Sequence, residues 1–226
     1  AQLARIPQAD GTLVATPGMP DDGLVPSLLA ASDVLGTGWF AADAAQVGPG
    51  KTVAVVGDGA VGLMGVLAAQ QMGAERIIAM SRHADRQALA REYGATDIVT
   101  ERGAEGAAKI KELTGGLGAH SVIEAVGTEE SMLQAIHATR GGGHIGFVGV
   151  AHEGVQLPLD QLFFAEVHLH GGPAPVRRYL PELIQKIWDR EIDPGKVFDL
   201  TLPLEQAAEG YAAMHERRAI KVMLTL

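Results

Sequence analysis

The amino-acid sequence predicts a doubly wound α/β fold, in which a six-stranded parallel sheet carries helices on both faces. From Lys51 onward, short β-rich runs alternate with helical patterns, which is the order typical of βαβ units. Strand-like runs such as Val53–Val56 are continuously apolar, as expected of strands that helices cover on both sides. The predicted helices end near glycines, which accept the left-handed backbone conformation found at helix C-termini.

Each predicted element follows from its local pattern. The predicted strands are Thr52–Val56, Arg76–Met80, Asp97–Val99, Ser121–Val126, His144–Val148 and Glu166–Leu169. The predicted helices between them are Ala60–Met72, Ala84–Tyr93, Glu105–Leu113 and Glu129–Thr139. Residues 180–188 also have a helical pattern, which tolerates Pro181 if that residue lies in the first turn. Residues 219–226 alternate apolar with other side chains, which predicts a half-buried final strand.

Composition and charge exclude several classes of protein. Of the 226 residues, 47% are hydrophobic and 20% are charged, which is the composition of a globular protein. The formal net charge of −9 opposes binding to nucleic acids and to acidic membrane surfaces. No apolar run reaches the roughly 18 residues of a membrane span, and the lack of cysteine rules out disulfides and thiolate zinc sites within this sequence. We therefore expect a cytoplasmic protein whose partners include neither nucleic acid nor membrane.

A glycine motif follows the first predicted strand and opens the first predicted helix. Its sequence is Gly-Asp-Gly-Ala-Val-Gly, residues 57–62. In Rossmann folds the first glycine permits a tight turn, the second lets a pyrophosphate approach the backbone, and the third lets the helix pack closely on the strand. The N-terminus of the helix presents free N–H groups to the anion. We predict dinucleotide binding at Gly57, Gly59, Ala60, Val61 and Gly62, and the alternative is a purely structural turn.

The residues about 20 positions further on indicate which dinucleotide is bound. NAD-binding proteins usually carry an acidic residue there to bind the ribose hydroxyls, whereas this sequence has Ser81 and Arg82. A hydroxyl and a guanidinium donate hydrogen bonds to a 2′-phosphate, which a carboxylate would repel. We therefore predict a preference for NADP(H) over NAD(H), with the adenosine end bound by Ser81, Arg82, His83 and Arg86.

One alternative is that Arg82 and Arg86 are solvated residues at a helix start, while Asp85 binds the ribose. The missing acidic residue also weakens a methyltransferase interpretation, because a ribose-binding carboxylate is commonly expected there too. The sequence has no Tyr-x-x-x-Lys pattern, which argues against a short-chain reductase.

Six short stretches occur in a specific order and spacing: Ser32–Trp39, Val56–Gly62, Tyr93–Asp97, Val122–Gly127, Gly146–Val150 and Ala219–Val222. Together they resemble the C-terminal part of the zinc-dependent alcohol dehydrogenases of the medium-chain dehydrogenase/reductase family. The resemblance covers essentially the whole chain.

The resemblance implies a site at which hydride passes from an alcohol to the nicotinamide. In the family, a zinc ion polarises the alcohol oxygen and is held by an upstream Cys, an upstream His and one residue at the position of Asp33. A carboxylate oxygen is a normal zinc ligand, so the resemblance implies that Asp33 binds zinc and that Asp33 and Thr37 are catalytic. The residues implied to border the nicotinamide or the pyrophosphate are Thr37, Val61, Val126, Val148, Val150, Gly171 and Lys221.

The resemblance also implies a division of the chain. Residues 1–24 would be the tail of an N-terminal catalytic domain, residues 25–200 the dinucleotide-binding Rossmann domain, and residues 201–226 a helix and strand that return toward the catalytic domain. The expected protein is an NADP-preferring, zinc-dependent alcohol or polyol dehydrogenase, of which this portion alone is inactive. Its expected partners are a small-molecule alcohol or carbonyl substrate and further copies of itself, in a homodimer or homotetramer. Two alternatives stay open: a non-catalytic dinucleotide-binding module, and a zinc-free reductase of the quinone-oxidoreductase type.

Overall fold

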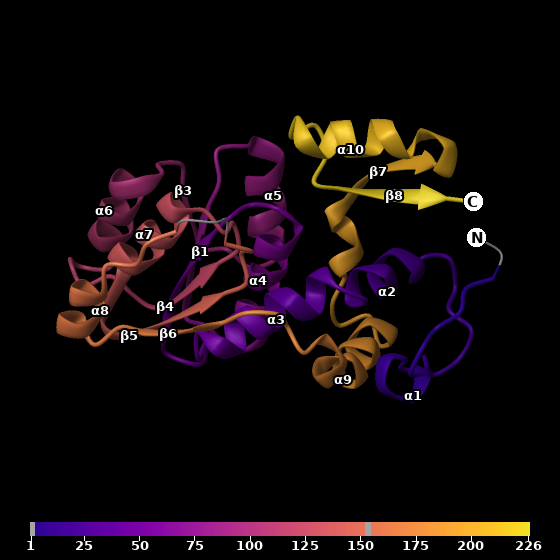
Figure 1. Ribbon diagram of the computed structural model, residues 1–226, viewed down its shortest axis with the longest axis horizontal. Helices are drawn as coiled ribbons and strands as arrows, with labels where there is room; N and C mark the ends of the chain where they lie inside the picture. Colours follow the sequence, from indigo (N-terminus) through magenta and orange to yellow (C-terminus); the bar gives the residue numbers. More distant parts are fainter. Residues whose placement is uncertain (1–2, 152–154) are drawn as a thin grey trace. The chain divides into compact units, whose positions relative to one another are not determined.

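The computed structural model describes residues 3–151 and 155–226 (Figure 1). It divides into two compact units, one of residues 37–174 and one of residues 1–36 together with 175–226. Residues 1 and 2 of the predicted N-terminal tail lie outside the described residues. The two units are defined by how compactly their residues pack, not by function. The functional boundaries predicted after residues 24 and 200 therefore stay a prediction.

The larger unit contains a six-stranded sheet in the order β3-β2-β1-β4-β5-β6, with every neighbouring pair parallel. The strands are β1 (Thr52–Val56), β2 (Arg76–Met80), β3 (Asp97–Val99), β4 (Ala119–Glu124), β5 (Thr139–Phe147) and β6 (His168–Gly171). The helices are α3 (Val34–Ala44), most of which belongs to this unit, α4 (Ala60–Gln71), α5 (Ala84–Glu92), α6 (Gly103–Leu113), α7 (Glu129–Ala138) and α8 (Leu159–Ala165). The predicted doubly wound Rossmann fold is confirmed.

Helices cover both faces of this sheet because the strands are apolar on both sides. On one face, a core that includes Ala54, Ile78 and Val122 packs against α6 and α7. On the other face, α4 lies close enough that a Cβ on its Gly65 would meet the Ile123 side chain at 3.2 Å. Figure 1 shows α4 and α6 on opposite sides of the strands.

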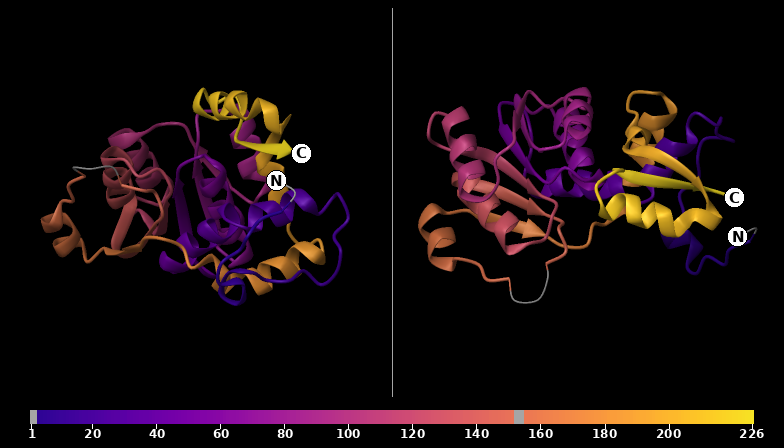
Figure 2. Two further views of the ribbon diagram at one scale, coloured as in Figure 1. Left: turned by 45° about the vertical axis from the view of Figure 1, so that its right-hand side comes forward. Right: turned by 90° about the horizontal axis from the view of Figure 1, so that it is seen from above.

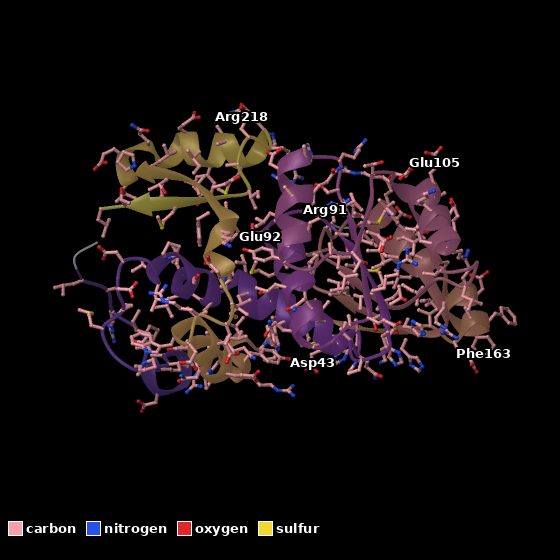
Figure 3. The ribbon with its side chains drawn as sticks, turned by 180° about the vertical axis from the view of Figure 1, so that it is seen from behind. Asp43, Arg91, Glu92, Glu105, Phe163 and Arg218 are labelled. Atoms are coloured by element: carbon pink, nitrogen blue, oxygen red, sulfur yellow. The ribbon has the colours of Figure 1, made fainter. Side chains whose placement is uncertain are left out.

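Both ends of the last three strands of this sheet differ from the prediction, since β4 starts at Ala119, β5 spans Thr139–Phe147 and β6 ends at Gly171. Two of these boundaries have clear local reasons. The fourth strand ends at Glu124 rather than Val126, because the N–H groups of Val126 and Gly127 donate to the Glu124 carboxylate instead of to a neighbouring strand. The sixth strand begins at His168 rather than Glu166, because Glu166 ends α8 with a left-handed φ of 53°. Helix α8 itself was not predicted. It carries exposed apolar side chains, among them Phe163, which extends away from the fold in Figure 3.

The smaller unit is built from helices and a two-stranded parallel sheet of β7 (Phe198–Pro203) and β8 (Lys221–Thr225). Its other elements are α1 (Ala9–Thr12), α2 (Val25–Ala31), α9 (Val176–Trp188), the 3₁₀ helices η1 (Pro194–Val197) and η2 (Leu204–Gln206), and α10 (Ala207–His215). Both views in Figure 2 show α10 alongside the two strands. The predicted final strand is confirmed and starts at Lys221. Strand β7 was not predicted.

Helix α9 corrects the prediction for Pro181. The helix begins at Val176 rather than Leu180, so Pro181 lies inside it and beyond the first turn. Proline has no N–H to donate, and the helix continues through Pro181 while burying Tyr179, Leu183 and Ile187. Among the described residues, no helix is both long enough and apolar enough to cross a membrane.

An ion pair at the far edge of the sheet predicts a pH-dependent stability. Arg76 Nε and Nη2 donate to Asp97 at 2.8 and 2.7 Å, and this hydrogen bonding lowers the pKa of Asp97 to about 2, from 3.8. The stabilisation is therefore complete above pH 3.8 and is lost as the pH falls toward 2. Because both side chains are partly exposed, we expect it to be about 1 kcal/mol.

The substitution Asp97→Asn tests this assignment through acid unfolding followed by circular dichroism. The substituted protein should be less stable at pH 7 and should lose less stability than the wild type between pH 4 and pH 2. Acid-unfolding curves that stay parallel over that interval would show that the pair contributes nothing.

Candidate functional site

The glycine motif forms the turn between β1 and α4. Gly57 has a φ of 123°, which side-chain-bearing residues rarely adopt, and a Cβ on Gly62 would lie 2.0 Å from the Gly57 carbonyl oxygen. Gly59 precedes α4 with an ordinary φ of −76°. Apart from Gly59 and its two chain neighbours, no described heavy atom lies within 4 Å of the place where its Cβ would stand. The turn thus leaves no room for a side chain at Gly62, where it packs on α4, but leaves open space at Gly59. A phosphate that binds the backbone N–H groups needs this open space.

This turn lies at the point where the strand order reverses. Strand β1 pairs with β2 on one side and with β4 on the other, and ligands of open α/β sheets bind at the carboxyl ends of such strands. The loop after β4 approaches the turn closely, since a Cβ on Gly57 would lie 3.1 Å from the Val126 side chain. Val126 itself is 44% exposed. Its predicted position beside the cofactor is therefore compatible with the fold.

Glu124 holds the loop that carries Val126. Its side chain is fully buried, and Oε1 accepts hydrogen bonds from Val126 N, Gly127 N and Ser131 Oγ at 2.8–2.9 Å. The Glu124 carbonyl accepts from Val148 N at 2.9 Å, at the start of the next loop. Oε2 is buried and has no hydrogen-bond partner among the described residues. One residue at the end of β4 thus fixes two loops at the edge of the predicted site.

A carboxylate also stands at the end of β2, although the sequence places none there. It belongs to Asp58 of the glycine turn, and Ser81 Oγ donates to Asp58 Oδ2 at 2.7 Å. Arg86 Nη1 donates to the Asp58 carbonyl oxygen at 3.0 Å and lies 3.5 Å from Oδ1. Sequence analysis missed Asp58 because its chain position lies far from β2. The only available signal was its place between the first two glycines of the motif.

The residues predicted at the adenosine end differ in how exposed they are. Arg82 is exposed, and His83 is half-buried at the start of α5, where its N–H donates to Ser81 Oγ at 3.2 Å. Arg86 is only 2% exposed, so the alternative that it is a solvated residue is wrong. Asp85 is exposed in the first turn of α5. The structure brings Ser81, His83 and Arg86 together and leaves Arg82 open to a ligand.

The residues predicted at the nicotinamide end belong to both units. Thr37 and Val61 are half-buried in the larger unit, as are Val148 and Gly171. Val150 is 83% exposed in the loop after β5, and Ala60 is the first residue of α4. Asp33 is exposed in the turn between α2 and α3, and Lys221 begins β8. Because these last two belong to the smaller unit, their roles toward the cofactor stay predictions.

The described residues do not form a zinc site by themselves. Within residues 3–151 and 155–226, no group of three or more His, Cys, Asp or Glu side chains is arranged to hold a metal ion. A catalytic zinc site needs about three protein ligands, and Asp33 would supply one. The geometry therefore fits a dinucleotide at the glycine turn, while a metal ion would require ligands from outside these residues.

Comparisons with known proteins find similar sequences. A family model described as "Zinc-binding dehydrogenase" matches residues 60–189. The chain is 38% identical over 219 residues to a "Probable zinc-binding alcohol dehydrogenase" of Mycobacterium tuberculosis, covering 96% of this chain and 55% of that protein. It is 36% identical over 170 residues to an NADP-dependent isopropanol dehydrogenase of Thermoanaerobacter brockii, covering 73% of this chain and 48% of that protein.

The fold is also found in solved structures. Zinc dependent alcohol dehydrogenase 2 from Streptococcus pneumonia, in its apo form, superposes with a TM-score of 0.86 at 26% identity. That superposition covers 99% of this chain and 64% of the other. The chain spans about half the length of the curated relatives it matches.

Proposed function

Because the chain belongs to the zinc-binding dehydrogenase family, we propose that it is the coenzyme-binding portion of an alcohol dehydrogenase and that it prefers NADP(H). The observation that carries the proposal is the turn of residues 57–62, which has no room for a side chain at Gly62 and open space at Gly59. A pyrophosphate that lies over Gly59 would accept hydrogen bonds from the N–H groups at the start of α4. The substrate is proposed to be a small alcohol or the corresponding carbonyl compound.

The bound nicotinamide supplies the chemistry, because it accepts or returns a hydride. The chain's own residues would bind and orient it. The glycine turn would hold the pyrophosphate, and Val126 would border the ring from the loop that Glu124 fixes. Asp33 would contribute one carboxylate to a zinc site completed from outside the described residues. A homodimer or homotetramer and a cytoplasmic setting belong to the same proposal.

The preference for NADP(H) rests on Arg82. Its guanidinium is exposed after the end of β2, where charge-assisted hydrogen bonds to a 2′-phosphate would form. Relatives described as NADP-dependent isopropanol dehydrogenases support this preference. The hydroxyl of Ser81 already donates to Asp58, so we assign the direct phosphate contact to Arg82 rather than to Ser81.

Side-by-side titrations with NADPH and NADH test the proposal, for example by isothermal titration calorimetry. We expect the Kd for NADPH to be at least about tenfold lower than that for NADH. The variant Gly59→Ala should weaken both nucleotides at least about tenfold, because its methyl group occupies the space above the turn. Its stability should change by no more than about 1 kcal/mol, since Ala is only a weaker helix cap than Gly.

A matched control shows whether the effect of Gly59→Ala is specific to the glycine turn. Gly48 lies in the loop before β1, at the opposite end of that strand, and the space around its Cβ position is equally open. Gly48→Ala should leave both affinities unchanged. A wild-type protein that binds neither nucleotide overturns the proposed function, whereas equal affinities overturn only the preference for NADP(H).

A further inference from the structure

Asp58 and Arg86 form a nearly buried charge pair beside the predicted 2′-phosphate position. The Arg86 side chain is 3% exposed and that of Asp58 is 11% exposed. The Arg86 guanidinium lies against both the carbonyl and the carboxylate of Asp58. Asp58 Oδ2 also accepts from Ser81, the residue after the last residue of β2. The carboxylate therefore reaches the end of β2 from the glycine turn.

An uncompensated carboxylate at this position would oppose the proposed preference. At the end of β2, an acidic group accepts hydrogen bonds from ribose hydroxyls and repels a 2′-phosphate. Repulsion between like charges is strong where burial lowers the local dielectric. Arg86 supplies the opposite charge, and its burial limits its own contact with a ligand.

We propose that Arg86 determines nucleotide specificity indirectly, by neutralising Asp58, and that it does not bind the 2′-phosphate itself. This inference rests on the proposed function of the glycine turn. In this arrangement Arg82 supplies the exposed positive charge toward the phosphate. Arg86 is a positioning residue, because it acts through the Asp58 carboxylate. NADH has no 2′-phosphate, so its binding is far less sensitive to the state of the pair.

A double-mutant cycle separates this role from a direct contact. The variants are Arg86→Met, Asp58→Asn and their combination, and the measurements are the Kd values for NADPH and NADH with the melting temperature of each protein. Arg86→Met should raise the Kd for NADPH at least about tenfold and that for NADH by no more than about threefold. Adding Asp58→Asn should return the Kd for NADPH to within about threefold of the wild-type value.

The control variant is Arg91→Met, which removes the same charge from α5. Arg91 is exposed near the end of that helix (Figure 3). The hydrogen bonds and ion pair found for Asp58 among the described residues involve Ser81 and Arg86 and not Arg91. It should leave the ratio of the two Kd values unchanged. If the double variant binds NADPH as weakly as Arg86→Met does, Arg86 contacts the phosphate directly and the inference is wrong. If Arg86→Met weakens the binding of NADPH and NADH equally, the pair of Asp58 and Arg86 has only a structural role and the inference is likewise wrong.

The single variant Asp58→Asn keeps the test decisive if Arg86→Met does not fold. It preserves the side-chain shape and leaves the Arg86 charge unopposed, so affinity for NADPH should rise relative to NADH by at least about threefold. An unchanged ratio overturns the inference. A wild-type protein that binds neither nucleotide would instead overturn the proposed function, so the two failures are distinguishable.

Discussion

Replacing Gly62 with alanine is expected to lower the free energy of unfolding by about 3 kcal/mol or more. The added methyl group would lie 2.0 Å from the Gly57 carbonyl oxygen and 2.7 Å from its carbon. Both atoms belong to the backbone, so no side-chain rotation relieves the overlap, and the turn must move away from α4. For a protein of this size the melting temperature should fall by roughly 10 °C. Affinity for NADPH should fall with it, because the displaced turn no longer presents its N–H groups correctly.

Comparison with Gly59→Ala separates an effect on stability from an effect on binding alone. Both substitutions add one methyl group to the same turn, but only at Gly62 does that group meet the protein's own backbone. Gly62→Ala should therefore reduce stability and binding together, whereas Gly59→Ala should reduce binding alone. Calorimetric melting of both variants checks the difference. A Gly62→Ala protein that melts with the wild type would show that the close approach of turn and helix is absent in solution.

Replacing Glu124 with alanine is expected to cost about 3 kcal/mol as well, for a different reason. Three donors, Val126 N, Gly127 N and Ser131 Oγ, would lose their shared acceptor. Ser131 Oγ keeps the Thr128 carbonyl as an acceptor at 2.9 Å, so the two backbone N–H groups are left without a partner, at about 1–3 kcal/mol each. The loop of Val126 and Gly127 should loosen, whereas Val148 N keeps its hydrogen bond to the backbone carbonyl of residue 124. NADPH affinity should fall with stability. Denaturant unfolding and nucleotide titration measure the two effects.

The conservative variant Glu124→Gln serves as the control. The glutamine carbonyl oxygen occupies the place of Oε1 and can accept from the same three donors. Its amide nitrogen takes the place of Oε2, which has no partner among the described residues. We expect the free energy of unfolding to fall less than half as much in Glu124→Gln as in Glu124→Ala. Equal losses in the two variants would mean that the negative charge, rather than the hydrogen bonding, holds the loop of Val126 and Gly127.

The fold was predictable because its signals are local. The strand Val53–Val56 and the glycines at 57, 59 and 62 are recognisable from adjacent residues alone. The boundaries of β1, β2 and β3 match the prediction, because each strand ends on apolar residues that a polar residue or glycine follows. Helix α8 gave no such signal, because a seven-residue helix has too few turns to show a clear period.

The site was predictable only in part, because its electrostatics depend on residues that are distant in the chain. The sequence shows that no acidic residue follows β2 directly. Only the folded chain shows that Asp58 places its carboxylate within hydrogen-bonding distance of Ser81. In the same way, the role of Glu124 depends on two loops that meet at the end of β4. Spacing along the sequence contains neither fact.

The strand order also has a consequence for how the chain reaches its native state. Strand β1 pairs with β4, so that Val53 lies opposite Ser121, and the chain between them must form two further strands and their helices. Closing so long a loop costs entropy before the pairing returns any contact, which slows folding relative to chains with local pairing. We therefore expect the β1–β4 junction, from which Gly57 and Val126 follow, to be assembled late in folding. Early folding species would contain the glycine motif in sequence but would lack a formed nucleotide crevice.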